Sequence, residues 1–340
     1  PPIIRHPLKN DKAKIGFFDI NSKEFHEIAE TEIWCWQQGC RLQWFPNTSN
    51  LQVFYNCMIT GDYASVIMDI SNGHKICEFR KPLYSLSPDG KYGLTLNFSR
   101  LQRLRPGYGY SLLPDKTLGL NEPENDGIWL VNLKNGEEKL LHSIKEIANT
   151  DRTDEMENAE HYFNHLFFAP DSKRFIFFHL WHKNGKRRSR LIVSDISDGI
   201  PKVFDNYFNV SHYTWKNSSE ILLTGTTADK KFEYRLLNIE NGNIVKIGNN
   251  ILNVDGHPTF LKSGTMILTD TYADKYGERH LLLFELNNQK INNIGYFYEP
   301  AKFAGEFRCD LHPRLSYDEK KVCIDFIYRG KRAIGIIDLP

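Results

Sequence analysis

The sequence predicts an all-β fold: a single β-propeller of seven four-stranded blades that occupies residues 1–340 as one domain. Three observations predict it: a four-strand motif recurs along the chain, aromatic residues are abundant, and segments with helical periodicity are nearly absent. The 22 Phe, 16 Tyr and 6 Trp include the types that favour strands. The 340 residues exceed the usual domain size of about 150, but propellers of this length fold as one unit.

Each repeat contains four expected strands. An apolar strand ends in a Pro-Asp or Asp-Gly turn, a second apolar strand follows, and after a polar loop a third strand ends in Asp-Ile or Asn-Leu. The first turn is found at 86–91, 168–173 and 315–320, and the third strand at 66–70, 128–133 and 334–339. Asn-Gly pairs at 72–73, 135–136 and 241–242 are hairpin signals that lead into the fourth strand.

Aligning the first strands on one apolar core position gives six anchor residues: Trp44, Leu86, Phe168, Trp215, Phe260 and Leu315. Most anchor spacings are about 42 to 55 residues, which suits a four-stranded blade. The long interval after Leu86 holds an insertion at 99–126 and an acidic loop at 148–160. Because residues 15–20 resemble a third strand and the chain ends after such a strand, we expect N-terminal sequence to complete the closing blade. The only helix-period segment is 140–147.

Composition argues against two classes of partner. Basic and acidic residues number 43 and 42, so no basic field favours nucleic acid or a membrane surface. No apolar run reaches the roughly 18 residues of a membrane-spanning helix.

Residues 1–5 do not look like a secretory signal, and the six cysteines, without a C-x-x-C pair, read as reduced thiols. We expect a cytoplasmic protein, or a periplasmic one if a signal has been trimmed.

Histidines occupy one repeat position in four successive blades. Three residues before the anchor, at what we call the pre-anchor position, stand His165, His212, His257 and His312; the two earlier repeats carry Arg41 and Leu83. In a propeller the first strands line the central channel, so these imidazoles are expected on one side of one funnel. Imidazole binds Mn, Fe and Zn and is the usual general base. The alternative is an inherited strand-capping residue, which the differing flanking residues disfavour.

Other polar groups are expected on the same face. The insertion begins with three arginines and two tyrosines: Arg100, Arg103, Arg105, Tyr108 and Tyr110. These could bind an anionic, sugar-like ligand through guanidinium contacts and ring stacking, or could form an exposed basic loop. His179, His182 and the loop 270–276 should reach the same face, whereas the basic run 186–190 reads as a solvated hairpin tip.

Three motifs resemble those of the oligogalacturonate lyase family, which are seven-bladed propeller polysaccharide lyases. They are Asp-Gly-His-Pro at 255–258, Asp-Leu-His-Pro at 310–313 and Ser-His-Tyr-Thr-Trp at 211–215. The resemblance covers about 160–340, and the repeats resemble those of TolB more loosely. It implies a divalent metal ion, typically manganese, on His257 and His312, with His212 as catalytic base. Asp310 stands where the family has His and would be an oxygen ligand; Phe307 stands where the family has a Gln ligand.

The chemistry that this resemblance implies is β-elimination from a uronic acid. A metal ion or arginine neutralises the sugar carboxylate, a base removes the C5 proton, and the 4-linked sugar leaves. We therefore expect a metal-dependent lyase acting on an anionic, uronate-containing oligo- or polysaccharide. The expected metal ligands are His165, His257, Asp310 and His312, the base is His212, and Arg308 with Arg100 binds the carboxylate.

Two other functions fit the sequence. One is a non-catalytic propeller that binds a glycan or a protein, since the fold hosts many functions. The other is a metal-dependent hydrolase with the same ligands. A simple binding module has no need of the four histidines, which favours the lyase.

Overall fold

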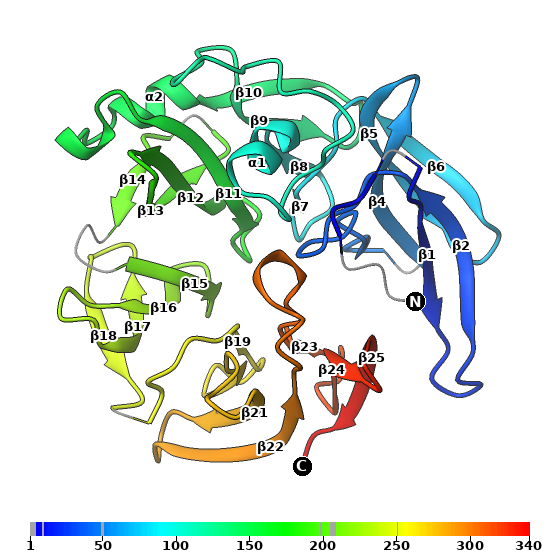
Figure 1. The fold of residues 1–340 in the computed structure, drawn as a ribbon, viewed down its shortest axis with the longest axis vertical. Coiled ribbons are helices and arrows are strands. Elements are labelled where there is room, and N and C mark those ends of the chain that lie inside the picture. Colours follow the sequence, from blue (N-terminus) through cyan, green and yellow to red (C-terminus); the bar gives the residue numbers. More distant parts are fainter. Residues whose placement is uncertain (1–4, 9, 49–50, 198, 205–208, 250) are drawn as a thin grey trace. The chain divides into compact units, whose positions relative to one another are not determined.

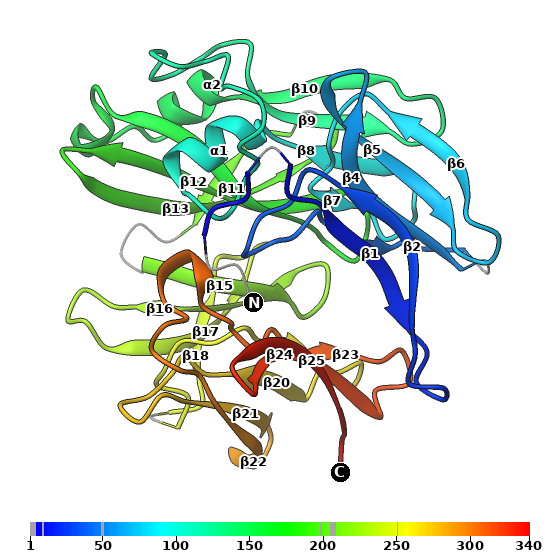
Figure 2. The ribbon, with the colours of Figure 1, turned by 45° about the vertical axis from the view of Figure 1, so that its right-hand side comes forward.

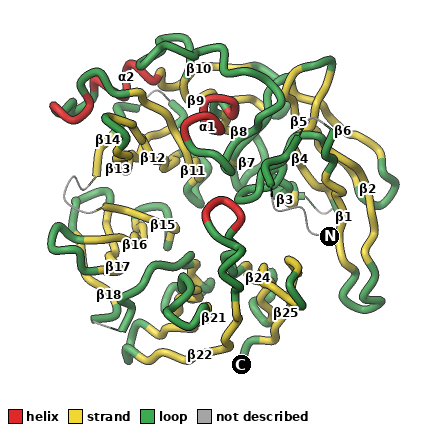
Figure 3. The backbone as a smooth tube through the Cα atoms, viewed as in Figure 1, coloured by secondary structure: helices red, strands yellow, loops and turns green. Residues whose placement is uncertain are grey.

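Antiparallel sheets make up most of the computed structural model, which describes residues 5–8, 10–48, 51–197, 199–204, 209–249 and 251–340 (Figures 1 and 3). The chain divides into two compact units. Among the described residues, the N-terminal unit ends at Phe204 and the C-terminal unit begins at Asn209. Each unit is described by itself.

Three four-stranded sheets follow one another in the N-terminal unit, and in each the strands lie in chain order (Figure 1). The first sheet contains β3 (Gln43–Trp44), β4 (Gln52–Ile59), β5 (Asp62–Asp69) and β6 (His74–Phe79). The second contains β7 (Ser85–Leu86), β8 (Tyr92–Thr95), β9 (Gly127–Asn132) and β10 (Glu138–Ser143). The third contains β11 (Glu160–Phe168), β12 (Arg174–Lys183), β13 (Lys186–Asp195) and β14 (Lys202–Phe204).

The inner strands of each sheet are apolar on both faces because both of their faces are buried. Six consecutive residues of β5 are buried, whereas five of the six residues of the outer strand β6 are exposed. Phe54 of the first sheet packs against Leu83 and Leu86 of the second in one apolar cluster. Neighbouring sheets thus cover each other's faces, which is how propeller blades bury their cores.

The hairpin of β1 (Ala13–Phe18) and β2 (Phe25–Thr31) forms a two-stranded sheet of its own (Figure 2). Its register runs from Ala13 opposite Thr31 to Phe18 opposite Phe25. Ile15 is 2% exposed and packs with Cys40 and Val53 of the first sheet region. The strand predicted at 15–20 is therefore present as β1.

The insertion between β8 and β9 contains the helix α1 (Phe98–Leu104), whose N-terminus is capped by the side chain of Asn97. It lies beside β11 (Figure 2). A second helix, α2 (Ile144–Asn149), and the 3₁₀ turn η1 (Asp154–Met156) follow β10. The prediction of a helix near 140–147 is confirmed only at its end, and α1 was not predicted because two turns are too short to show a helical period.

Three further sheets form the C-terminal unit. The first contains β15 (Asn209–Trp215), β16 (Glu220–Thr226), β17 (Phe232–Asn238) and β18 (Ile244–Ile247). The second contains β19 (Thr259–Phe260), β20 (Met266–Asp270), β21 (Glu278–Glu285) and β22 (Lys290–Tyr298). The third contains β23 (Arg314–Leu315), β24 (Lys321–Tyr328) and β25 (Lys331–Asp338). The 3₁₀ turn η2 (Gly305–Phe307) precedes β23. Leu268, Leu311 and Val322, all fully buried, share one apolar cluster with neighbours from both of the last two sheets.

The fold prediction is confirmed in class and corrected in number. Every predicted anchor is the last residue of the first strand of its sheet. Six sheets follow the repeat, five with four strands and one with three, so the described residues show six blades rather than seven four-stranded ones. The reason is that β1 and β2 pair only with each other and β25 has no fourth strand beside it among the described residues. Closure of the ring by the N-terminus and a single domain over 1–340 stay predictions.

Neither helix in the described part of the chain is long and apolar enough to cross a membrane.

Candidate metal and acid–base site

The pre-anchor position has an unusual backbone. Arg41, His165 and His312, which share it in three repeats, have φ of 59°, 55° and 43°. This left-handed conformation is uncommon outside glycine, although His adopts it more readily than most residues. Register shifts precede the anchors of β11 and β15, between Asn164 and Phe167 and between Val210 and His212. The first strands therefore bend before the anchor, and the bend sets the direction of the side chain.

Three of the four predicted histidines come together in the C-terminal unit. The ring of His257 lies 4.2 Å from that of His212 and 4.1 Å from that of His312, measured between centroids. The ring of Tyr272 lies 6.0 Å from His212 and 5.9 Å from His257. Three successive repeats thus bring their imidazoles into one row, as the shared repeat position predicts.

Asp270, the last residue of β20, holds two of these histidines. Its buried carboxylate lies 3.0 Å from Nδ1 of His257 through each oxygen. It also accepts hydrogen bonds from the backbone N–H groups of His257 at 2.6 Å and of His312 at 3.1 Å. Because Nδ1 of His257 is engaged, Nε2 is the nitrogen left to bind something else.

Asp255 holds the third histidine in the same way. Its Oδ1 lies 2.9 Å from Nδ1 of His212 and accepts a hydrogen bond from Oγ1 of Thr224 at 3.1 Å. The other carboxylate oxygen accepts from Ser211. A carboxylate on Nδ1 fixes the ring orientation and leaves Nε2 as the basic nitrogen.

The three histidines differ in pKa. Burial lowers the pKa of His212, and the charge of His257 lowers it further. The same two causes hold the pKa of His312 well below its ordinary value. For His257 burial opposes the charged form, but the charge and hydrogen bond of Asp270 outweigh it and raise the pKa. His212 and His312 therefore favour the neutral form, which has a lone pair to offer.

A second set of charges surrounds Asp310, which is 1% exposed. Nε of Arg308 donates to Oδ2 of Asp310 at 2.6 Å. Nη1 of Arg279 lies 2.8 Å from Oδ1, close enough for an ion pair but without hydrogen-bond alignment. Arg279 is itself buried and bonded to Glu299 through Nε at 2.7 Å. Asp310 is thus fixed in place while Oδ1 keeps the capacity to bind a further partner.

The group His257, Asp310 and His312 fits a divalent metal ion. One ligand atom from each lies within 4.8 Å of the others. Two of these atoms are imidazole nitrogens and one is a carboxylate oxygen, a donor set that suits Mn, Fe or Zn. The ring nitrogens of His312 and Nε2 of His257 make no hydrogen bond among the described residues, and Oδ1 of Asp310 accepts none.

The fourth predicted histidine, His165, lies in the N-terminal unit. Its ring is 5.9 Å from that of Tyr108, over which the guanidinium of Arg105 lies at 3.9 Å. Its backbone N–H donates to the hydroxyl of Tyr84 at 3.1 Å. Arg105 and His165, both half-buried, therefore lie against the buried Tyr108, and the predicted roles of the three residues stay predictions.

Two of the predicted substrate-binding arginines, Arg100 and Arg103, bind to groups of the protein itself. Arg100 is 1% exposed, and its guanidinium donates to the backbone carbonyls of His161, Leu120 and Asn121. Arg103 forms ion pairs with Asp115 and Glu160. Arg100 is thus buried among backbone carbonyls, and Arg103 is half-buried between two carboxylates; their predicted contacts with a ligand stay predictions.

Tyr110 and His179 are buried as well. Tyr110 is 1% exposed, and its hydroxyl accepts from the side chain of Asn56 at 2.9 Å. His179 belongs to a buried chain in which Nε of Arg190 donates to Nδ1 of His179 at 3.0 Å, and Nε2 of His179 lies 2.8 Å from Nδ1 of His161. Nε2 of His161 lies 3.2 Å from the carbonyl of Met156.

The position of Arg190 corrects the prediction that the basic run 186–190 is a solvated hairpin tip. Arg187 and Arg188 are exposed near the tip of the β12–β13 hairpin, but Arg190 is 4% exposed. Its Nη2 donates to the carbonyls of Ile147 and Thr150, at the end of α2. The last arginine of the run therefore belongs to the interior.

The sequence identified the histidines but not the groups that orient them. From the sequence, Asp255 is part of a motif and Asp270 part of a loop, with no role assigned to either carboxylate, and neither Arg279 nor Glu299 is a candidate. One signal was present: Asp255 and Asp310 both stand five residues before an anchor. Their shared repeat position could have shown that each faces the pre-anchor histidines.

No known protein family and no curated protein matches the sequence. Solved structures match over nearly the whole chain. An oligogalacturonate lyase from Vibrio parahaemolyticus is 11% identical, with a TM-score of 0.59, over 98% of this chain and 99% of that chain. An oligogalacturonate lyase in complex with manganese is 11% identical, with a TM-score of 0.53, over 98% of each chain.

The β-propeller domain of the Trilobed protease from Pyrococcus furiosus is 13% identical, with a TM-score of 0.50, over 87% of this chain and 82% of that chain. At these identities the likenesses establish the β-propeller fold and do not assign a function.

Proposed function

We propose that this protein is a metal-dependent lyase that cleaves a uronate-containing oligosaccharide by β-elimination. The observation that carries the proposal is the juxtaposition of His212, oriented by Asp255, with a group of three potential metal ligands. A base beside a cation site is what proton abstraction next to a carboxylate requires. The structural likeness to two oligogalacturonate lyases agrees with this choice at the level of the fold.

His257, Asp310 and His312 would hold the metal ion, which we propose is manganese. When bound, the ion supplies positive charge that stabilises the carboxylate of the sugar as negative charge develops there. Asp270 keeps the ring of His257 in place, and Arg279 and Arg308 keep Asp310 in place.

His212 would act as the base. Its Nε2 accepts the C5 proton, the C5–H electrons form the C4–C5 double bond, and the C4–O bond breaks to release the linked sugar. The departing oxygen takes a proton from solvent, and the imidazolium later returns its own. Asp255, 2.9 Å from Nδ1, stabilises the imidazolium that forms in this step.

Arg308 is the proposed partner for the substrate carboxylate. It is half-buried, donates to Asp310 through Nε at 2.6 Å and to the carbonyl of Gly305 through Nη1 at 3.3 Å, and its guanidinium lies 5.6 Å from the centre of the Tyr272 ring. A planar guanidinium suits bidentate carboxylate binding.

The test combines metal analysis with turnover. Purified protein is analysed for bound metal and assayed with oligogalacturonate for the ultraviolet absorbance of an unsaturated uronate product. We expect His257→Ala to lose both metal and turnover, and His312→Gly, which suits the left-handed backbone, to do the same. His212→Ala should keep the metal and lose about 10²–10⁴-fold in rate.

The exposed His74 in β6 provides the matched control, because His74→Ala removes an exposed imidazole that is not among the proposed site residues. Wild-type protein that binds metal but gives reducing ends without ultraviolet absorbance would point to hydrolysis. Protein that binds no divalent metal and turns over no uronate substrate would refute the proposal in favour of a binding module.

A further inference from the structure

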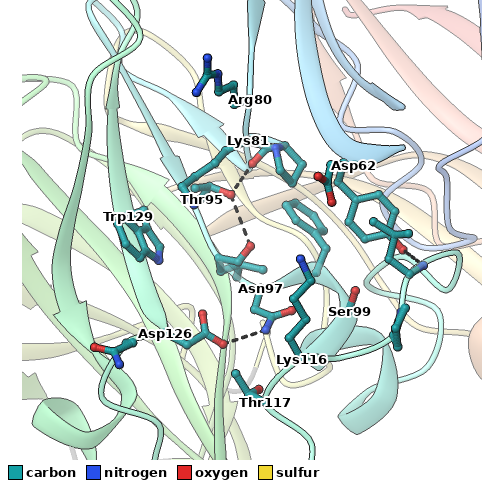
Figure 4. Close-up of a pocket in the computed structure, with 17 residues that line it drawn as sticks. Asp62, Arg80, Lys81, Thr95, Asn97, Ser99, Lys116, Thr117, Asp126 and Trp129 are labelled. Carbon is teal, nitrogen blue, oxygen red and sulfur yellow. Dashed lines mark hydrogen bonds between the residues drawn. The ribbon is translucent and has the colours of Figure 1, made fainter. Parts of the chain in front are cut away.

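A pocket of about 400 Å³ lies in the N-terminal unit, where the first sheet, the second sheet and the insertion meet (Figure 4). Its walls come from the start of β5, the segment 80–82, the end of β8, the insertion and β9. The volume lies in the range of small-molecule sites, about 300–1,000 Å³. Every lining residue belongs to this unit, so the pocket shares no residue with the histidine row.

Hydrogen bonds within the walls fix the shape of this pocket. Asn97 donates through Nδ2 to Asp126 at 2.8 Å, and its Oδ1 caps α1 at Arg100. The hydroxyl of Tyr63 accepts from the backbone of Leu113 at 2.7 Å. These bonds tie the insertion to β5 and β8, so the pocket is preformed.

Several polar groups of the lining are left over. The side chains of Arg80, Lys116 and Asn125, the carboxylate of Asp62 and the indole N–H of Trp129 line the pocket but make no hydrogen bond or ion pair among the described residues. Figure 4 shows Lys116 pointing toward the middle, with Trp129 and Asp62 on opposite sides and Arg80 at the rim with its guanidinium turned outward. The unused groups are mainly donors, two of them cationic.

Among the described residues, no carboxylate lies within ion-pair distance of the Lys116 ammonium, although Asp62 also lines the pocket. Lys81 is already engaged, since its ammonium lies 3.3 Å from Glu138 and 4.3 Å from the centre of the Trp129 ring. Burial raises the pKa of Asp126, whose carboxylate is bonded to Asn97. An ammonium group facing a preformed pocket without a carboxylate partner favours an anionic ligand.

We infer that this pocket binds an anionic monosaccharide, a sugar carrying a carboxylate or a phosphate. The charged group would lie on Lys116, with Arg80 able to swing in from the rim. Asp62 and Asn125 offer acceptors for sugar hydroxyls, and the indole N–H of Trp129 donates from the other side. A bare anion would leave the acceptors and the aromatic wall unused, which is why a sugar is favoured.

Calorimetric titration of the full chain tests this inference with four probes: D-galacturonate, D-galactose 6-phosphate, D-galactose and inorganic phosphate. We expect at least one charged sugar to bind, and neutral galactose and phosphate to bind at least tenfold more weakly. Lys116→Ala should weaken the charged sugar at least tenfold, and Trp129→Phe should weaken it to a smaller extent. Lys134→Ala, an exposed lysine in the turn between β9 and β10, is the matched control and should change nothing.

His257→Ala separates this pocket from the proposed metal site. Binding of the charged sugar that persists in this variant supports the inference even if the protein proves not to be a lyase. Loss of binding in His257→Ala, no effect of Lys116→Ala, equal binding of galactose or phosphate, or no binding of either charged sugar would each overturn it.

Discussion

Replacing Asp270 by Asn tests how much the buried carboxylate contributes to the histidine row. Asp270 is 0% exposed and faces three donors: the backbone N–H groups of His257 and His312 and Nδ1 of His257. An amide has one acceptor oxygen, and its NH₂ group would face a donor. At least one buried donor then loses its partner, at about 1–3 kcal/mol, and the charge partner of His257 is lost. Since breaking a buried ion pair alone costs about 3–5 kcal/mol, we expect the free energy of unfolding to fall by at least about 3 kcal/mol.

Urea unfolding followed by circular dichroism measures this difference, and exchange of the two backbone amides reports it locally. Asp338→Asn is the control, because its ion pair with Lys321 lies on the surface, where such pairs contribute at most about 1 kcal/mol. A loss below about 0.5 kcal/mol for Asp270→Asn, with both amides still protected, would refute the reasoning.

Three further predictions concern other polar groups. Burial lowers the pKa of His161 to about 4 from an ordinary 6.5, so between these pH values the unfolded chain binds more protons than the folded one. The free energy of unfolding should therefore fall by up to about 3 kcal/mol as the pH drops from about 6.5 to 4. Thermal melts at several pH values should show a shallower pH dependence for His161→Phe than for the wild type, and an identical dependence would contradict the assignment. Arg100→Ala should lower the free energy of unfolding by about 3 kcal/mol, because backbone carbonyls lose their donors, and fully wild-type urea stability would argue against it. Asp255→Asn should keep bound metal and lower turnover of the proposed lyase by about 10²–10⁴-fold, whereas a wild-type pH–rate profile and rate would show that Asp255 does not position His212.

The repeat accounted for the fold and for the place of the histidines because both depend on short-range patterns. Each anchor could be identified from its apolar strand and following turn, and the pre-anchor position followed by counting. The helix α1 could not be identified, because its stability depends on the Asn97 cap and on packing against β11 rather than on its own periodicity. The number of blades depends on which strands pair at the ends of the chain, and no local pattern specifies that pairing.

Charged residues were harder to assign than apolar ones. Arg100 and Arg190 have the same sequence signature as solvated arginines, but the backbone carbonyls that surround them come from segments distant in the chain. Asp270 is equally hard to assign from the sequence. An acidic residue at the end of a strand usually faces solvent, and one of its partners, His312, comes from the next repeat. Long-range partners decide whether such a residue is structural, and a single sequence does not display them.

The left-handed backbone at the pre-anchor position has a consequence for how this protein can diverge. At His312 the φ of 43° disfavours β-branched and bulky residues and tolerates glycine without strain. A single exchange of His312 for glycine would remove an imidazole while relaxing the chain, so selection on stability alone would not oppose it. Proteins descended from this one could therefore keep a stable propeller after losing the proposed metal site, and a single substitution at this position would be enough.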